Sequence, residues 1–174
     1  HGSAAIIWTK LNENPKIIRI LISNPEITAE EQLSIIYPNS QNSSTEEIDK
    51  IAATIKAFLR GEDIIFSLDC VDLEACTPFQ KAVLLADHQI PRGSISTYQH
   101  IAKHIGKEKG ARAVGNALAT NPFPLTIPCH RVIRGDGTIG GFRGGSAMKK
   151  ALLEAEGIRF DHNGRIISPK YHYK

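Results

Sequence analysis

The chain has 174 residues, of which 41% are hydrophobic and 22% are charged, and its formal net charge is +3. This balance is typical of a globular protein and excludes a collagen, a long coiled coil or extended disorder. The longest apolar runs, such as Ala4 to Trp8, are too short to cross a bilayer, and no signal-peptide pattern is present, so we expect neither a membrane anchor nor secretion.

The first 76 residues alternate predicted strands and helices, after an opening His-Gly-Ser that we expect to be a tag remnant. Residues 6–8 and 17–22 predict a β-hairpin with its turn at 12–15. Two acidic amphipathic helices are expected next, and the second opens with a capping box at 44–47. A further short strand is predicted over residues 64–68. This half is expected to be a structural α/β layer without a catalytic constellation.

The second half, residues 77–174, is predicted to be mainly helical. Thr77 to Gln80 opens a helix, with proline at the first helical position and Gln80 closing a capping box. Ser96 to Gln99 opens a shorter helix that runs through Ile105, and residues 106–110 form a polar turn. A third helix follows over about 111–120, and the basic end of the chain is expected to contain little strand. The sequence therefore predicts an α/β protein of two domains, 1–76 and 77–174.

The second and third of these helices, joined by a glycine-bearing turn, have the arrangement of a helix–turn–helix. The second member, residues 111–119, consists largely of Ala and Gly with a single Arg112. Such small side chains favour close approach to the minor groove over base-specific contacts in the major groove. The alternative is an Ala-rich helix packed in a core, with Arg112 as a surface cation, and spacing alone leaves both open.

The charges of the two halves have opposite sign. Residues 1–76 carry 6 Lys and Arg against 12 Asp and Glu, whereas residues 77–174 carry 15 against 6. A basic half indicates a polyanionic partner, most simply nucleic acid, although chance drift of surface charge remains an alternative.

The cysteine and histidine content argues against a disulfide framework and a metal site. Three cysteines with no CxxC pair fit a reducing compartment, and we interpret Cys70 and Cys76 as structural or incidental. His100 and His104 are four residues apart on one predicted helix, but no third ligand is evident. We therefore interpret them as surface histidines near phosphate.

The segment Pro128-Cys129-His130 places a soft nucleophile beside a base. A free cysteine titrates near about 8.5, so it needs a neighbouring base or cation to react as a thiolate at neutral pH. His130 can take the thiol proton directly or through a water, and a carboxylate behind it would orient the ring. The alternative is a buried structural cysteine next to a packed histidine.

Residues 121–132, Asn-Pro-Phe-Pro-Leu-Thr-Ile-Pro-Cys-His-Arg-Val, resemble the active-site signature of the O6-alkylguanine-DNA alkyltransferases, also called methylated-DNA–protein-cysteine methyltransferases. The resemblance extends over about residues 77–157. Its other motifs are Gly-Ser-Ile-Ser-Thr-Tyr at 93–98, Arg-Ala-Val-Gly at 112–115, the glycine-rich loop at 140–145 and Leu-Leu-Glu-Ala-Glu-Gly at 152–157.

The resemblance implies a role for each matched residue of the reaction centre. Cys129 would accept the alkyl group, His130 would act as base through a bridging water, and Glu156 would orient His130. Asn121 would tie the turn before the active-site segment. Tyr98 would help to rotate the phosphate and would donate a hydrogen bond near the guanine oxygen or ring nitrogen.

The resemblance also implies a DNA-binding set and a base pocket. Arg112 would replace the flipped nucleotide in the stack, and the other DNA-binding positions would be Ala113, Gly115, Thr97 and Tyr98. The pocket would be walled by Phe142, Arg143, Gly144 and Ser146. Many members of the family have Tyr followed by Ser where this chain has Phe142 and Arg143, which puts the acceptance of bulky adducts such as benzyl in question.

The family's fold and activity complete these expectations. The N-terminal half would be ribonuclease-H-like, and the C-terminal half would hold the helix–turn–helix and the active-site cysteine loop. The protein would bind double-stranded DNA as a monomer, flip out O6-alkylguanine (or O4-alkylthymine) and transfer the alkyl group irreversibly to Cys129. No metal, organic cofactor or membrane is implied, and the location would be the cytoplasm, or the nucleus in a eukaryote.

Three rival functions differ in what they require of the sequence. A lesion-binding alkyltransferase-like protein would lack the acceptor cysteine, which is present here as Cys129. A transcription regulator would need base-reading side chains over residues 111–120, and these are mostly absent. A Cys-His hydrolase or redox enzyme would form a thioester or use a resolving cysteine, but Cys70 and Cys76 lie outside the motif region.

Overall fold

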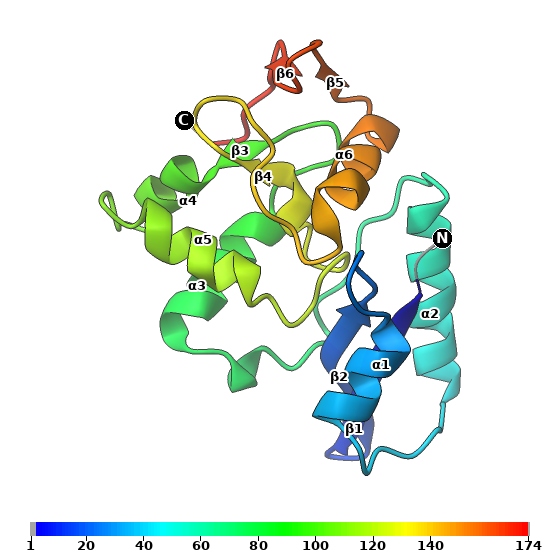
Figure 1. The fold of residues 1–174 in the computed structure, drawn as a ribbon. Helices are drawn as coiled ribbons and strands as arrows, with labels where there is room; N and C mark the ends of the chain where they lie inside the picture. Colours follow the sequence, from blue (N-terminus) through cyan, green and yellow to red (C-terminus); the bar gives the residue numbers. More distant parts are fainter. Residues whose placement is uncertain (1–2, 174) are drawn as a thin grey trace.

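A computed structural model describes residues 3–173, so His1 and Gly2 of the expected tag remnant lie outside the described residues (Figure 1). The N-terminal hairpin and its two helices lie on one side of the molecule, and the helix–turn–helix lies on the other (Figure 1). The elements of the first half are β1 (Ala4–Leu11), β2 (Asn14–Ile22), α1 (Ala29–Ile36), α2 (Glu46–Leu59) and the 3-10 helix η1 (Leu73–Ala75). Those of the second half are α3 (Pro78–His88), β3 (Ser96–Thr97), α4 (Tyr98–His104), α5 (Ala111–Ala119), the 3-10 helix η2 (Cys129–Arg131), β4 (Val132–Ile133), α6 (Gly145–Ala155), β5 (Arg159–Phe160) and β6 (Ile166–Ile167).

Strands β1 and β2 form the antiparallel hairpin that the sequence predicts. Asn12 and Glu13 make its two-residue turn, and both have positive φ angles, 49° and 66°. Positive φ at both central residues is the backbone of a type I′ turn, whose twist matches that of the flanking strands. The hairpin is therefore closed by the Asn-Glu pair, which sets the register from Leu11 back to Trp8; a bulge between Ile7 and Trp8 shifts it by one residue beyond that point.

Helices α1 and α2 confirm the two acidic helices, but the predicted capping box of α2 does not form. The N-cap of α2 is Thr45, whose side chain accepts a hydrogen bond from the Ile48 amide. Ser44 instead donates to a carboxylate oxygen of Asp49, at 2.5 Å. The helix start was thus predicted within one residue, and the capping partner was wrong.

The strand predicted over residues 64–68 is wrong, because this segment is irregular and pairs with no other strand. Side chains from the end of α3 and just beyond it satisfy the backbone here. The His88 ring is 2.8 Å from the Phe66 carbonyl oxygen, and Arg92 donates to two carbonyl oxygens just before the segment. The segment therefore needs no strand partner at Phe66, whose ring packs edge to face on Phe58 of α2.

The three helices predicted after residue 77 are present as α3, α4 and α5, and their caps were predicted in part. Thr77 caps α3 by accepting from the Gln80 amide, as expected. The Gln80 side chain does not close a capping box; it donates to carbonyl oxygens at the C-terminal end of α5. This contact ties α3 to the second helix of the helix–turn–helix.

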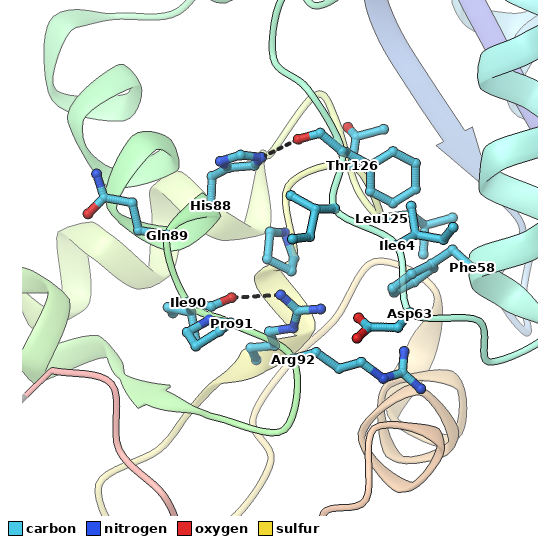
Figure 2. A pocket seen from close by; sticks show the side chains of 14 residues that line it. Phe58, Asp63, Ile64, His88, Gln89, Ile90, Pro91, Arg92, Leu125 and Thr126 are labelled. Atoms are coloured by element: carbon cyan, nitrogen blue, oxygen red, sulfur yellow. Dashed lines mark hydrogen bonds between the residues drawn. The ribbon is translucent and has the colours of Figure 1, made fainter.

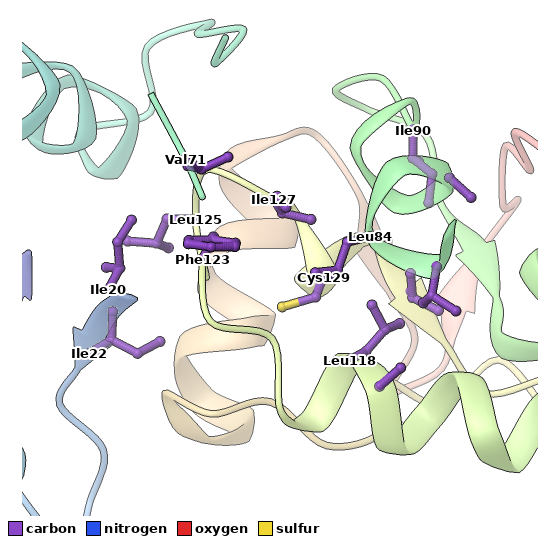
Figure 3. Close-up of a cluster of buried hydrophobic side chains, with 14 of the residues drawn as sticks. Ile20, Ile22, Val71, Leu84, Ile90, Leu118, Phe123, Leu125, Ile127 and Cys129 are labelled. Carbon is purple, nitrogen blue, oxygen red and sulfur yellow. The ribbon is translucent and has the colours of Figure 1, made fainter. Parts of the chain in front are cut away.

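One hydrophobic core spans both halves of the chain. It contains Ile20 and Ile22 of β2 together with Phe123 and Cys129 of the second half (Figure 3). The halves also share backbone hydrogen bonds, since the Ile20 amide donates to the Pro122 carbonyl at 2.7 Å. The N-terminal half therefore packs directly behind the segment that carries Cys129. Within residues 3–173, no helix is long and apolar enough to cross a bilayer.

Candidate active site and DNA-binding surface

A tight turn at residues 121–127 places Cys129 at the start of η2. The Asn121 side chain accepts a hydrogen bond from the Phe123 amide and donates to the Ile127 carbonyl and to Cys129 Sγ, both at 3.3 Å. Leu125, inside the turn, has a φ of 74°, a conformation that non-glycine residues rarely adopt. The surrounding packing holds this strain, since Leu125 is 1% exposed. The position of the cysteine is thus fixed before any ligand arrives.

Cys129 is a buried thiol at rest. Its side chain belongs to the main core, and burial together with the nearby Asp87 raises its pKa to about 12, although the hydrogen bond from Asn121 acts in the opposite direction. A thiol in this state reacts slowly with electrophiles in solution, because the thiolate is the nucleophile. Reaction therefore requires a group that removes the proton.

His130, the next residue, is joined to Glu156 and Arg131 in a buried network. His130 Nε2 is 3.0 Å from Glu156 Oε1, and the same carboxylate accepts from Arg131 Nε and Nη2 at 2.8–3.1 Å. Burial opposes ionisation of Glu156, but the hydrogen bonds from His130 and Arg131 outweigh it and lower its pKa to about 2. Glu156 is consequently an anion at neutral pH.

This network determines the tautomer of His130. An ionised Glu156 can only accept, so His130 Nε2 must carry the proton, and Nδ1 is left with a lone pair. Burial lowers the pKa of the ring, so it is neutral at pH 7. Nδ1 is buried and has no hydrogen-bond partner among the described residues. The free nitrogen of His130 is thus an unused base next to Cys129 in the sequence.

A cavity of about 290 Å³ opens beside Cys129. Tyr98 at the start of α4 forms one wall, and its hydroxyl lies so close to Gly140 that a Cβ there would be 2.8 Å from it. The volume is at the lower end of the range for small-ligand sites, which suits one nucleobase with a small substituent. The cavity is lined by Tyr98, Gly115, Leu118, Ala119, Cys129, Gly141, Phe142 and Arg143.

The loop at 141–146 contributes two of the four predicted pocket residues. Phe142 and Arg143 line the cavity, and Arg143 Nη2 donates to the Ala119 carbonyl at 3.2 Å, which joins the loop to the end of α5. Gly144 is buried behind the loop, where a Cβ would overlap Met148. Ser146 is exposed on α6 and does not line the cavity.

The predicted DNA-binding residues fall into an exposed group and a buried one. Arg112 and Ala113 are exposed on α5, and Gly115 lies against the Tyr98 ring. Thr97 is buried, and its hydroxyl oxygen accepts from the His100 amide as the N-cap of α4. The side chain of Thr97 is therefore part of the helix cap and does not reach the surface.

The two histidines of α4 pack against the end of the chain. His104 stacks on Tyr173 at 4.0 Å between ring centroids, and His100 meets Tyr171 edge to face. Over the described residues, no group of three or more His, Cys, Asp or Glu side chains could hold a metal ion.

Sequence reasoning gave no role to three buried charged side chains: Asp87 and Lys149, whose charges act on Cys129, and Arg131, which pairs with Glu156. Lys149 is fully buried and donates to the Val132 and Gly141 carbonyls at 2.6 and 3.1 Å. A signal for it was available, since Lys149 precedes Leu152 and Leu153 by three and four residues and so shares their buried face of α6. Lys149 thereby holds the pocket loop to the strand that follows the cysteine.

A second cavity of about 310 Å³ lies behind the active-site segment (Figure 2). Its walls come from both halves of the chain, including Phe58 of α2, His88 and Arg92 near the end of α3, and Leu125 of the strained turn (Figure 2). Arg131 also lines it, so this cavity reaches the network around Glu156, which the cysteine cavity does not share through any lining residue.

The helix–turn–helix formed by α4 and α5 lies beside a cavity that holds a buried Cys-His-Glu arrangement, which is the combination expected of a protein that presents a thiol to a bound nucleic acid. Residues 78–158 match the family model described as "6-O-methylguanine DNA methyltransferase, DNA binding domain". The chain is 46% identical over 114 residues to a methylated-DNA–protein-cysteine methyltransferase of Methanothermobacter thermautotrophicus, covering 66% of this chain and 64% of that protein. It is 38% identical over 123 residues to the enzyme of that name from Methanosarcina acetivorans, covering 71% and 78%.

Solved structures agree with the sequence comparisons. The O6-methylguanine methyltransferase of Mycobacterium tuberculosis has a TM-score of 0.64 at 30% identity, covering 88% of this chain and 93% of that one. The OGT of the same organism, solved in complex with DNA, has a TM-score of 0.58 at 38% identity, covering 63% and 66%. The chain belongs to the methylated-DNA–protein-cysteine methyltransferase family, as the sequence predicted, with N-terminal strands and helices followed by a helical DNA-binding half. The match spans less than two thirds of the Methanothermobacter relative.

Proposed function

We propose that this protein repairs O6-alkylguanine in DNA by transferring the alkyl group to its own Cys129. The observation that carries the proposal is the buried arrangement of Cys129, His130 and Glu156 beside a cavity of nucleobase size. Family membership supports the same reaction, because the relatives are named for methyl transfer from DNA to a cysteine.

The proposed reaction is a single displacement. The Cys129 proton passes to His130 Nδ1 through a bridging water, and Glu156 stabilises the imidazolium that forms. The thiolate attacks the alkyl carbon, a C–S bond forms, and the C–O bond to the guanine oxygen breaks. Tyr98 donates a proton to the leaving guanine. A thioether has no good leaving group, so each molecule acts once.

The proposed binding mode is nucleotide flipping from the minor groove. A base inside a duplex cannot reach the cavity, and extrusion costs a few kcal/mol, less for a weakly paired alkylated base. The small residues Ala113 and Gly115 let α5 approach the groove closely, and exposed Arg112 fills the gap in the stack. Thr97 contributes as the cap of α4, and Tyr98 rotates the phosphate. Phe142 and Arg143 wall the base, with Gly144 and Ser146 completing the loop.

We propose the remaining properties from the family and the sequence. O4-alkylthymine would be a second substrate, and the protein would act as a monomer on double-stranded DNA in the cytoplasm, or in the nucleus of a eukaryote. No metal or organic cofactor is required, because the base already activates the alkyl group. We also propose that the chain divides into residues 1–76 and 77–174, and that the first part is ribonuclease-H-like.

The test is intact-protein mass spectrometry after incubation with a duplex that contains one O6-methylguanine, using the wild type and Cys129→Ser. We expect one added methyl group per wild-type chain, on Cys129, and none on the variant. Folded, reduced protein that binds the lesion without gaining mass would favour lesion sensing. Absence of both binding and transfer would overturn the proposed function. Binding should also weaken steeply with salt if the basic half contacts phosphates.

A further inference from the structure

Asp87 lies in the last turn of α3, on the face that packs against the cysteine. Leu84 is three residues earlier on the same face and belongs to the buried cluster that contains Cys129, and α3 is in contact with η2, the 3-10 helix that begins at Cys129. Asp87 is fully buried, with an exposed fraction of 0%. A carboxyl group is therefore enclosed near the reactive thiol, and the proposed reaction gives it no role.

Neither oxygen of Asp87 has a hydrogen-bond partner among the described residues. The two cations in its surroundings use their described hydrogen bonds elsewhere. Arg131 donates to Glu156 and to the Ile90 carbonyl, and Lys149 donates to two backbone carbonyls. Within residues 3–173 no cation approaches Asp87 to within 4.0 Å, so Arg131 pairs with Glu156 and not with Asp87. An unpaired, fully buried carboxylate is costly, so this environment favours the neutral acid.

The position of Asp87 on α3 also favours the neutral form of its carboxyl group. The negative end of the α3 dipole lies at its last turn, where a second negative charge is unfavourable. Burial raises the pKa of Asp87 to about 8, although Arg131 and Lys149 oppose the rise. Asp87 thus changes from acid to anion within the range in which Cys129 must react.

We propose that Asp87 is a positioning residue that controls the charge of the Cys129 thiol: neutral Asp87 permits the thiolate, and ionised Asp87 keeps the sulfur protonated. Two negative charges in one buried region repel strongly, and such interacting groups titrate as a pair. Lys149 and Arg131 attract both groups and moderate the repulsion. The charged and titratable groups around the pair are Tyr98 on α4, His130 and Arg131 in η2, Lys149 on α6, Arg143 in the pocket loop and Tyr173 near the chain end. The inference concerns the reaction under Proposed function, but the coupling can be measured without DNA.

The test compares wild type with Asp87→Asn, which keeps the shape and removes the charge. The rate of Cys129 alkylation by iodoacetamide is followed from pH 6 to 9.5 by mass spectrometry of the Cys129 peptide. We expect the two rates to agree within twofold below pH 7, where Asp87 is neutral in the wild type. Above pH 8 the variant should react faster, by at least about threefold at pH 9.5. The rate of methyl transfer from DNA should show the same difference between wild type and Asp87→Asn above pH 8.

Three controls keep the result specific. Cys70 and Cys76 lie outside the electrostatic range of Asp87 and should react alike in both proteins at every pH. Asp136→Asn, at an exposed carboxylate, should leave the Cys129 profile unchanged. If Asp87→Asn fails to fold, Asp87→Leu provides a second neutral variant with the same expectation.

Two outcomes would overturn the inference. One is a pH profile of Cys129 that is the same in wild type and in the neutral variants. The other is a uniform loss of Cys129 reactivity at all pH values, which would mean that a carboxyl group is needed for structure. The wild type could fail to accept a methyl group from DNA while the iodoacetamide pH profiles of wild type and Asp87→Asn still differ. That result would reject the proposed function but would support the coupling between Asp87 and Cys129.

Discussion

His130 Nε2 is 3.0 Å from Glu156 Oε1, and both side chains are shielded from solvent. The pair joins η2 to the end of α6, so the base is held by an element that follows it by 26 residues. Because Glu156 also accepts from Arg131, one carboxylate fixes the tautomer of the histidine and neutralises a buried guanidinium.

Replacing Glu156 by Gln should lower both the folding stability and the rate of methyl transfer. The change leaves Arg131 buried without a counter-charge, so the free energy of unfolding should fall by about 3 kcal/mol. It also removes the anion that stabilises the His130 imidazolium, so methyl transfer should slow by about 100-fold. Urea unfolding and single-turnover transfer measure the two effects. Glu154→Gln, at a half-exposed carboxylate on the same helix, is the control, and a wild-type transfer rate in Glu156→Gln would contradict the assigned role.

The same carboxylate predicts the acid stability of the protein. Folding lowers the pKa of Glu156 from its usual 4.5 to about 2. Its contribution is therefore fully present above pH 4.5 and is lost as the pH falls towards 2. The difference in unfolding free energy between wild type and Glu156→Gln should shrink between pH 5 and pH 3. A difference that stays constant over this range would show that Glu156 does not titrate as proposed.

The pKa of Asp87 predicts the opposite dependence of folding stability on pH. Its pKa rises from 3.8 to about 8 on folding, so the folded protein binds the proton more tightly than the unfolded chain does. The stabilisation from this proton is complete below pH 3.8 and is lost as the pH rises through 8. Asp87→Asn has no such dependence, so it should become more stable relative to wild type from pH 5 to pH 8. Thermal unfolding of both proteins across this range would reveal the trend or its absence.

Arg112→Ala should slow repair of duplex DNA without affecting the chemistry. An arginine that fills the gap left by the flipped nucleotide matters only where a stack exists, so the variant should lose about tenfold in rate on a duplex and little on a single strand. Methyl transfer from O6-methylguanine in both substrates measures this. Arg159→Ala, an exposed arginine of β5, controls for lost positive charge. Equal losses on both substrates would mean that Arg112 serves only general DNA affinity.

Arg143→Ala should widen the range of accepted adducts. The hydrogen bond from Arg143 to the Ala119 carbonyl joins two walls of the cavity, whereas Gly144 is packed too tightly for the loop to retreat. Removing this side chain should raise the rate ratio of benzyl to methyl transfer by about tenfold. Arg143→Lys keeps the charge and shortens the reach, so it should lie between the two. A ratio unchanged in both variants would assign the size limit to Phe142.

The helices and the reaction centre were predictable because their signals are local. Helices α3, α4 and α5 follow from caps, turns and apolar spacing, and the cysteine segment carries its own motif. The strand predicted over residues 64–68 was wrong, since an apolar run indicates burial but does not indicate whether a strand partner exists. Whether side chains from α3 would satisfy its backbone depended on contacts distant in sequence.

The charges around Cys129 could not be predicted because they become neighbours only through folding. Asp87 and Lys149 come from α3 and α6, more than 60 residues apart. Their spacing relative to apolar residues indicates a buried helix face, but it does not indicate what they face. The family motif predicted that Arg143 lines the pocket. Its hydrogen bond to the Ala119 carbonyl could not be predicted, because it depends on how the loop and α5 are placed relative to each other.

The opposite charges of the two halves influence how the molecule is oriented as it approaches a polyanion. The acidic start of α2 lies on the side of the molecule away from α5 (Figure 1). Such a molecule is an electric dipole, and the field of a polyanion exerts a torque on it before the surfaces touch. The N-terminal half supplies no reacting group. Its negative charge would instead orient the molecule so that the thiol-bearing side faces DNA.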